Sequence, residues 1–287
     1  MEQQLTITYY HHSGFSVAVN DRLLVFDYWL GEHDEVPEEK RLTDEVFEQY
    51  ARVYYFISHE HPDHFDKRLH DRWKKNPRLQ FIVSHDMPIG VTGKRMAPGD
   101  VLSFPDGVTV VAYESTDLGV SFLVKVDGMS IFHAGDLNFW HWRDESTTRE
   151  IAEAEDEFQQ AVEPIRQEEV DVAFFPVDPR QGQMYDAGAN YFIMSVKPRL
   201  LIPMHFWNHV EMANEFARRS RSRQTEIIAM SRPGEQLQVD MEDGGYMTVT
   251  LLTPAKPQPA ELPEVKLQGY DGDDPFSDTD LPVSMDE

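Results

Sequence analysis

The stretch YYFISHEHPDHFD, residues 54–66, changes character in its middle. Its first residues belong to an apolar run at 53–57, whose aromatic and β-branched side chains predict a buried strand. The polarity then reverses, and three imidazoles and a carboxylate follow within six residues, as His59, His61, Asp63 and His64. Polar residues that follow a buried strand in this way are typical of sites in α/β folds. We therefore expect a functional site here.

This density of imidazole and carboxylate groups favours metal binding. A lone histidine is more often an ordinary hydrogen-bonded residue than a ligand. Three in one turn are different, because buried polar groups are costly unless they are paired. A divalent cation pairs them, since His nitrogen and Asp oxygen are its usual ligands and two cations can share a ligand-rich loop.

The bulk properties narrow the choice of partners. At 287 residues the chain can form one large domain or two small ones, and its net charge of −25 disfavours nucleic acid and anionic membranes as partners. The absence of cysteine excludes disulfides and thiolate ligands. No signal peptide is visible and no apolar run approaches the ~20 residues that span a bilayer. We expect a soluble, cytoplasmic protein with a small-molecule substrate, and leave a homo-oligomer open.

Hydrophobic periodicity predicts strands and helices that alternate along the chain. Strands are predicted at 5–10, 15–20, 23–29, 53–57, 81–86, 170–177, 199–205, 225–230 and 246–252, and several more lie within 101–133, where Asp127-Gly128 joins a hairpin. Helices are predicted at 42–51, 146–169, 186–196 and 211–222, and Pro164 must kink or end the second of them. From Pro254 onward, 6 prolines and 9 acids against 2 lysines predict an extended or disordered tail. The predicted domains are therefore 1–253 and the acidic tail 254–287.

Three motifs in order resemble those of the metallo-β-lactamase superfamily. Residues 59–64 match the signature HxHxDH, IFHAGD ends in Asp136, and LIPMH ends in His205. The opening segments HHSGFSV and LLVFDYW resemble the branch that contains the ascorbate-6-phosphate lactonases and the N-acylphosphatidylethanolamine phospholipases D. The resemblance covers residues 5 to about 252. It implies an α+β fold, an αββα sandwich of two mixed β-sheets with helices on the outer faces.

The resemblance also implies two divalent metal ions, Zn²⁺ or Mn²⁺. The ligands would follow apolar runs, and they are His59 and His61 for one ion, Asp63, His64 and His205 for the other, and Asp136 as the bridge. A hydroxide held between two such cations is a nucleophile at neutral pH. Asp63 would be the catalytic residue that orients this hydroxide and passes its proton to the leaving group.

One ligand that the family usually provides is missing. Related sequences read roughly Ala-Tyr-His-Ser where this chain reads Ala112-Tyr113-Glu114-Ser115. Either Glu114 replaces the imidazole as a metal ligand, or the first site is weakened or empty. An oxygen ligand would tilt the site toward harder ions such as Mn²⁺. The remaining alternative is that Glu114 is a surface acid beside Asp117.

The stretch that follows Asp136 indicates where the substrate lies. We predict that residues 137–142 form a pocket wall in which Asn138, Trp140 and His141 contact the substrate. The alternative is an aromatic plug that packs the following helix onto the sheet. By resemblance, His12 lies near the mouth of the pocket.

Other polar residues at strand ends have supporting roles. Asp27 and His133 are expected to orient metal ligands from behind rather than to bind metal. The segment FFPVDPR, residues 174–180, ends another predicted strand, so Asp178 and Arg180 are candidates for substrate contact.

These features predict a metal-dependent hydrolase of a small ester, lactone or phosphoester. A first alternative is a non-catalytic metal-binding or sensor protein of the same fold that lost catalysis with the change at Glu114. A second is an RNA-processing nuclease, which the acidic composition disfavours.

Overall fold

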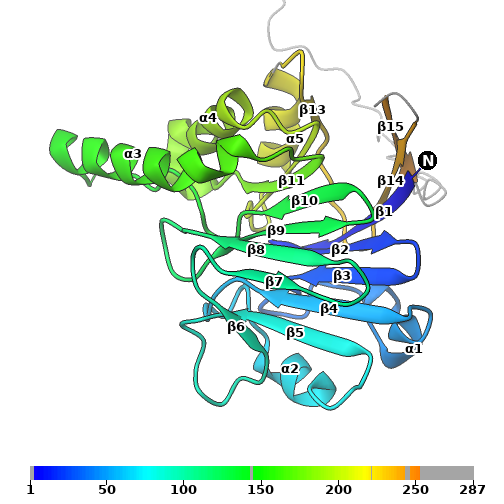
Figure 1. Cartoon of the computed structure of the whole chain (residues 1–287). Coiled ribbons are helices and arrows are strands. Elements are labelled where there is room, and N and C mark those ends of the chain that lie inside the picture. Colours follow the sequence, from blue (N-terminus) through cyan, green and yellow to red (C-terminus); the bar gives the residue numbers. More distant parts are fainter. Residues whose placement is uncertain (1–2, 143–144, 221, 243–245, 253–287) are drawn as a thin grey trace, which may run out of the picture. The chain divides into compact units, whose positions relative to one another are not determined.

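Two mixed β-sheets pack face to face at the centre of the structure, and helices cover their outer faces (Figure 1). The structure is a computed structural model that describes residues 3–142, 145–220, 222–242 and 246–252. The predicted αββα sandwich is confirmed. The predicted acidic tail, 254–287, lies outside the described residues. No helix among the described residues has both the length and the apolar character needed to cross a membrane.

The first sheet has eight strands and changes from antiparallel to parallel pairing at β3. Its order is β15 (Met247–Leu252), β14 (Gln236–Met241), β1 (Gln3–His11), β2 (Gly14–Val19), β3 (Arg22–Phe26), β4 (Arg52–Ile57), β5 (Leu79–Ser84) and β6 (Lys94–Met96). The strands from β15 to β3 pair antiparallel, and those from β3 to β6 pair parallel.

The second sheet has seven strands and the same mixed character. Its order is β13 (Glu226–Ile227), β12 (Leu200–Met204), β11 (Val172–Pro176), β10 (Met129–His133), β9 (Ser121–Val126), β8 (Thr109–Tyr113) and β7 (Val101–Ser103). The strands from β13 to β10 pair parallel, and the others antiparallel. Parallel strands in one sheet end at the same edge, so the loops that follow them gather there.

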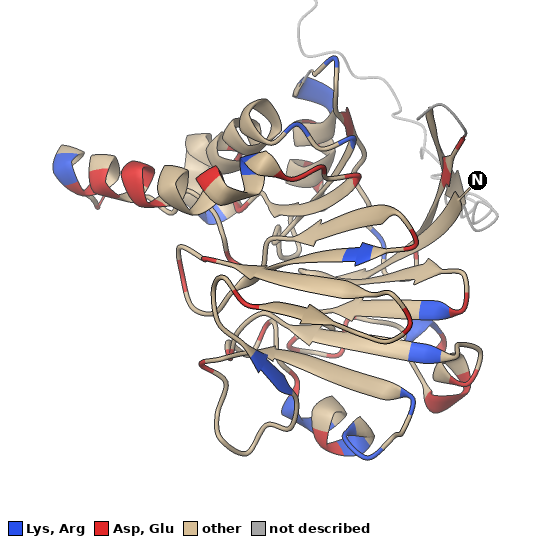
Figure 2. Ribbon diagram, viewed as in Figure 1, with Lys and Arg blue, Asp and Glu red and all other residues tan. Residues whose placement is uncertain are grey.

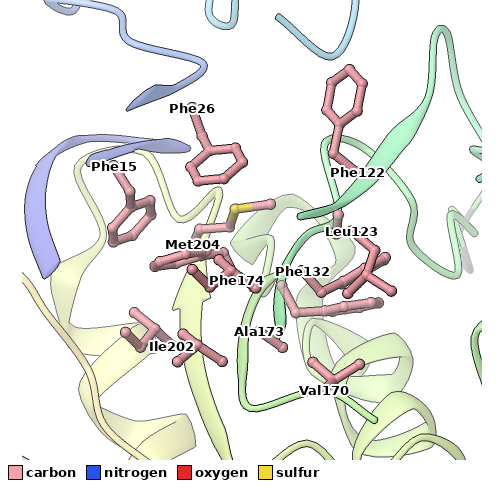
Figure 3. Packing of buried hydrophobic residues seen from close by; sticks show 14 of the residues in the cluster. Phe15, Phe26, Phe122, Leu123, Phe132, Val170, Ala173, Phe174, Ile202 and Met204 are labelled. Carbon is pink, nitrogen blue, oxygen red and sulfur yellow. The ribbon is translucent and has the colours of Figure 1, made fainter. Parts of the chain in front are cut away.

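Alternating side chains explain why β4 is apolar throughout. Tyr54 and Phe56 belong to the cluster between the two sheets, whereas Tyr55 and Ile57 belong to a second cluster on the other face. A strand buried on both faces reads as a continuous apolar run. Figure 3 shows part of the inner cluster, where Phe15 lies 4.3 Å from Phe174 between ring centroids. Burial of each such side chain contributes about 1.5–3 kcal/mol.

The helices divide between the two outer faces. On the first sheet, α1 (Asp44–Phe47) and α2 (Lys67–Trp73) cover the second cluster, where Phe47 meets Trp73 edge to face at 4.9 Å. On the second sheet lie α3 (Thr148–Val162), α4 (Ala187–Ser195) and α5 (Val210–Arg219) (Figure 1). Short 3-10 turns occupy Glu38–Lys40, Glu163–Gln167 and Pro179–Met184.

The long acidic helix α3 ends where its sequence predicts, and a capping box that was not predicted begins it. Thr147 and Glu150 form a reciprocal capping box at its start. Near Pro164 the α3 helix gives way to the 3-10 turn Glu163–Gln167, because proline cannot continue the regular hydrogen bonding. The red segments of the ribbon in Figure 2 mark its acidic residues along the projecting part of α3.

Several predicted boundaries were wrong. The strand predicted at 23–29 ends at Phe26, because Asp27 has a left-handed φ of 39° that turns the chain. The helix predicted at 42–51 is regular only over Asp44–Phe47, and the strand predicted at 225–230 is reduced to Glu226–Ile227. Helix α2 and strand β14 were not predicted.

Candidate metal centre and active site

Polar side chains from distant parts of the chain meet where several strands end. Three groups have ligand atoms that lie within 4.8 Å of one another. The inner group is His12, Asp63, His64 and His205; the bridging group is His59, His64 and Asp136; the outer group is His61, Asp117 and Asp136. The structure thus brings together the six residues that the three sequence motifs singled out.

Asp136 is the point on which the imidazoles converge. Its Oδ1 lies 3.1 Å from His64 Nε2 and 3.2 Å from His205 Nε2, and its Oδ2 lies 3.4 Å from His59 Nε2. The carboxylate follows β10 in the turn 134–137, and it is 4% exposed. One carboxylate therefore connects ligands that come from the ends of β4 and β12.

Carboxylates behind the imidazoles fix the direction of their ring nitrogens. Asp27 Oδ2 lies 2.8 Å from His64 Nδ1, and Asp178 Oδ2 lies 2.9 Å from His205 Nδ1. When Nδ1 donates to such a carboxylate, the lone pair of Nε2 points toward the site, as in many metal centres. Asp27 thus lies behind a ligand, where the sequence placed it.

Ser58 extends this arrangement to the first histidine of the motif. Its hydroxyl donates to Asp27 Oδ2 at 2.6 Å and lies 2.9 Å from His59 Nδ1. The backbone amide of Ser58 also donates to Asp27. His133 acts on the neighbouring turn, where its Nδ1 accepts from the amide of Gly135 at 3.2 Å. The turn that carries Asp136 is therefore supported from within the core.

Two glycines allow neighbouring loops to approach this motif. A Cβ on Gly119 would lie 1.9 Å from the Ser58 carbonyl oxygen, and a Cβ on Gly135 would lie 2.8 Å from Ser58 Cβ. Both residues also have positive φ, at 78° and 54°. Any side chain would force the loops away from the histidine motif.

Non-glycine residues with left-handed backbone also occur at the site. His12, Asp27, His205 and Trp207 have φ of 54°, 39°, 63° and 53°. Such conformations cost of order 1–3 kcal/mol each and persist only where the surroundings enforce them. The site is therefore held in shape by the fold.

Burial and the opposite charges of neighbouring side chains shift the pKa values of the imidazoles and carboxylates in this cluster. Burial opposes a charge on His205, but Asp136 and Asp178 outweigh it and raise the pKa of His205 to about 9. Burial also opposes ionisation of Asp136, but His64, His205 and His59 outweigh it and hold the pKa of Asp136 well below its ordinary value. For His12, burial dominates and lowers the pKa to about 3, so this imidazole is neutral.

Several buried atoms at this site lack a hydrogen-bond partner among the described residues. They are both ring nitrogens of His12, Nε2 of His64, Nε2 of His205 and Oδ1 of Asp136. Apart from His12 Nδ1, these atoms make ion-pair contacts of 3.1–3.2 Å, between the imidazoles of His64 and His205 and Asp136 and between His12 and Asp63. Imidazole nitrogen and carboxylate oxygen are the usual ligand atoms of divalent cations, and a bound cation would take the place of the protons that His64 and His205 hold between them and Asp136.

The predicted ligand Glu114 is exposed and belongs to none of the three groups. Its place in the outer group is taken by Asp117, whose Oδ2 lies 3.8 Å from His61 Nδ1. The role of Glu114 as a ligand stays a prediction, and Asp117 is a carboxylate that the sequence analysis named only as its neighbour. The feature of the sequence that could have identified Asp117 is that it is a second acid in the same loop, three residues after Glu114.

His12 lies deeper than the pocket mouth where the sequence placed it. Its side chain is fully buried, and its Nε2 lies 3.1 Å from Asp63 Oδ2. The ring also lies 4.0 Å from that of His205. The structure thus makes His12 a member of the inner group, and its contact with substrate stays a prediction.

The predicted wall combines residues with different surroundings. Trp140 lies 5.6 Å from His205 between ring centroids and donates through Nε1 to the Asp136 carbonyl. Asn138 and His141 are buried, and both contact Gln181. Trp140 therefore faces the site, whereas substrate contacts by Asn138 and His141 stay predictions.

Two residues near the site have roles that sequence reasoning missed. Asp178 is fully buried and binds His205, so its carboxylate is already used within the protein. Trp207 lies 4.4 Å from His12 and 5.9 Å from His205 between ring centroids. The feature of the sequence that could have identified Trp207 is its position two residues after the predicted ligand His205.

Comparisons with known proteins agree with this site. The family model of the beta-lactamase superfamily domain matches residues 6–155, more than half of the chain. The chain is 26% identical over 260 residues to a UPF0173 metal-dependent hydrolase of Opitutus terrae, which covers 82% of this chain and 100% of that protein. It is 21% identical over 250 residues to a UPF0173 metal-dependent hydrolase of Thermococcus kodakarensis, covering 79% and 96%.

A solved structure shares the fold. The metallo hydrolase Igni18 of Ignicoccus hospitalis superposes with a TM-score of 0.59 at 19% identity, covering 82% of this chain and 98% of that one. The family match, the two relatives and the cluster of His and Asp side chains lead to one assignment. The chain belongs to the beta-lactamase superfamily and is a metal-dependent hydrolase of that superfamily.

Proposed function

We infer that the protein hydrolyses a small ester, lactone or phosphoester at a site that holds two divalent ions, Zn²⁺ or Mn²⁺. The observation that carries this proposal is the convergence of three buried imidazoles on the Asp136 carboxylate, a set of ligand atoms that suits divalent cations. His59, His61 and Asp117 would hold one ion, Asp63, His64 and His205 the other, and Asp136 both. A bound divalent cation supplies Lewis acidity, which lowers the pKa of water and polarises a carbonyl or phosphoryl oxygen.

Asp63 has the properties of the proton-handling group. Its side chain is 17% exposed, whereas that of Asp136 is 5% exposed, so Asp63 is the more accessible of the two carboxylates. Burial opposes its ionisation, but the bond to His12 and the charge of His64 outweigh burial and lower the pKa of Asp63. An ionised, accessible carboxylate can accept a proton at Oδ2 and release it to a leaving group.

Metal analysis and one substitution test this function. The protein should contain about one to two equivalents of Zn²⁺ or Mn²⁺. Asp63→Ala should abolish hydrolysis of a panel of aryl esters, lactones and phosphodiesters, while circular dichroism and thermal unfolding show a folded protein. Full activity in this variant would refute the role of Asp63.

Each of the two alternative functions predicts a different experimental result. A non-catalytic metal-binding protein is favoured by the exposed Glu114 at the position of the usual histidine, and it predicts tight metal binding without turnover on the whole panel. An RNA-processing nuclease predicts RNA binding that weakens steeply with salt. A gel-shift titration at two salt concentrations separates this alternative from a small-molecule hydrolase.

A further inference from the structure

A cavity of about 450 Å³ lies beside the wall that follows Asp136. Its lining includes Trp142, Glu145, Arg180 and Gln181. Gln181 ties the cavity to the wall, because it accepts from Asn138 Nδ2 at 3.0 Å and donates to the Phe139 carbonyl at 2.6 Å. This volume is within the range of small-molecule sites. None of these four residues belongs to a metal group.

Arg180 connects the cavity to the metal centre. Its Nε lies 3.0 and 2.9 Å from the two carboxylate oxygens of Asp178, and Nη2 donates to the same group. Asp178 in turn binds His205 Nδ1. One carboxylate therefore lies between the guanidinium and a predicted metal ligand, which fixes the distance of Arg180 from the reacting centre.

Two tryptophans flank the guanidinium. Arg180 Cζ lies 5.0 Å from the ring centroid of Trp207 and 5.8 Å from that of Trp142. Cation–π contacts of this kind hold an arginine in a fixed direction. The side chain of Arg180 is still 49% exposed, and the structure records no partner for its Nη1 among the described residues. The guanidinium of Arg180 is thus held in a fixed direction, is accessible to solvent and has one donor, Nη1, that an external group can use.

We propose that Arg180, clamped by Asp178 and flanked by Trp142 and Trp207, is the anion subsite of this enzyme, so that its substrate carries a carboxylate or a phosphate group beside the bond that is cleaved. The proposal rests on the proposed function for the reaction and adds the charge class of the substrate. Nε and Nη2 already donate to Asp178, so Nη1 is the donor left for the anion, and a charge-assisted hydrogen bond from it suits a carboxylate or a phosphate oxygen.

The electrostatics explain why such a subsite is needed. The chain carries a net charge of −25, which repels an anionic substrate at long range. Burial opposes the charge on Arg180, but Asp178, Asp136 and Asp63 outweigh it and raise the pKa of Arg180, so the guanidinium stays charged beside Asp178. Glu145 also lines the cavity, so the anion must bind on the Arg180 side.

Equilibrium binding to the metal-loaded protein tests this subsite without any turnover. The probes are benzoate, phenylphosphonate and the neutral benzamide, which share one ring and differ in the charged group. We expect wild-type protein to bind at least one of the anions about tenfold more tightly than benzamide, as a charge-assisted hydrogen bond predicts. Whichever anion shows the larger preference identifies a carboxylate or a phosphate as the natural group.

Substitutions assign that preference to one side chain. Arg180→Gln should reduce the preference about tenfold, and Arg180→Lys should retain part of it because the charge remains. Arg149→Gln, which removes an equal charge from the exposed start of α3, should leave the preference unchanged. An undiminished preference in Arg180→Gln, or no preference in wild type, would overturn the proposal. The titration measures binding alone, so it can support the anion subsite even if the hydrolase assays show no turnover. Likewise, the assays can show hydrolysis even if the protein has no preference for the anions.

Discussion

The inner and outer ligand groups contact the same cluster but are held in different ways. The side chains of His12, His64 and His205 are at most 1% exposed, whereas those of His61 and Asp117 are 39% and 40% exposed. Buried carboxylates fix two of the inner imidazoles, and no such carboxylate binds His61 among the described residues. The inner group is thus preorganised by the fold, while the side chains of His61 and Asp117 in the outer group are held less firmly.

Removal of the Asp136 carboxylate should have the largest effect. Asp136 is a member of the outer group and also contacts His64 and His205 of the inner group. We expect Asp136→Ala to lose most of its bound metal and about 10³-fold or more of its hydrolytic activity, since both the ligand and the metal's Lewis acidity are lost. Elemental analysis after dialysis measures the metal, with Asp117→Ala as the control that should lose at most one ion. Full metal occupancy in Asp136→Ala would show that the two groups bind independently.

The loop of the outer group can be disturbed without changing a ligand. In Gly119→Ala the new Cβ would overlap the Ser58 carbonyl oxygen, so we expect the free energy of unfolding to fall by about 3 kcal/mol. Gly107→Ala is the matched control, because Gly107 also has a positive φ, of 91°, but has open space around its Cβ position. It should cost about 1 kcal/mol in urea unfolding. Equal costs would mean that the contact with Ser58 does not matter for stability.

The carboxylates behind the inner imidazoles allow a direct test of preorganisation. Asp27→Asn and Asp178→Asn retain the shape of the side chain but remove its charge, so we expect each to weaken metal affinity about 10–100-fold. Competition with a chromophoric chelator gives these affinities. If both variants bind metal as tightly as wild type, burial alone accounts for the order of the inner group.

The sequence motifs named Asp63, His64 and His205 of the inner group but not His12, and metal binding by these residues stays a prediction. The apolar runs that end at Ile57, His133 and Met204 are strands β4, β10 and β12. β10 and β12 run parallel in the second sheet and so end at one edge, and the packing of the two sheets brings the end of β4 in the first sheet beside them, where His59 and His64 contact Asp136. A buried strand that is followed abruptly by polar residues therefore predicts both the fold and most of the candidate metal ligands. The same logic placed Asp27 behind a ligand, although the left-handed turn that aims it could not be seen in the sequence.

Other features depend on conformations that local patterns do not encode. Asp178 was a candidate for substrate contact; its carboxylate binds His205 and caps the 3-10 turn Pro179–Met184, Arg180 lines the cavity, and substrate contact by either residue stays a prediction. His12 was placed at the pocket mouth, yet the backbone at φ 54° turns it into the cluster. Such choices are made by packing between segments that lie far apart in the sequence.

The smallest expected effect separates two acids of one loop. We expect Asp117→Asn to weaken binding of the outer ion about tenfold, because it removes the charge of an exposed oxygen ligand, and Glu114→Gln to change it less than twofold. Mn²⁺ titrations followed by the paramagnetic relaxation of water protons measure both constants, and each variant controls for the other because both remove one negative charge. A larger loss in Glu114→Gln would mean that the loop closes differently around its metal, with Glu114 as the ligand that the missing histidine predicts. The outer group would then be ordered by the ion itself, in contrast to the inner group.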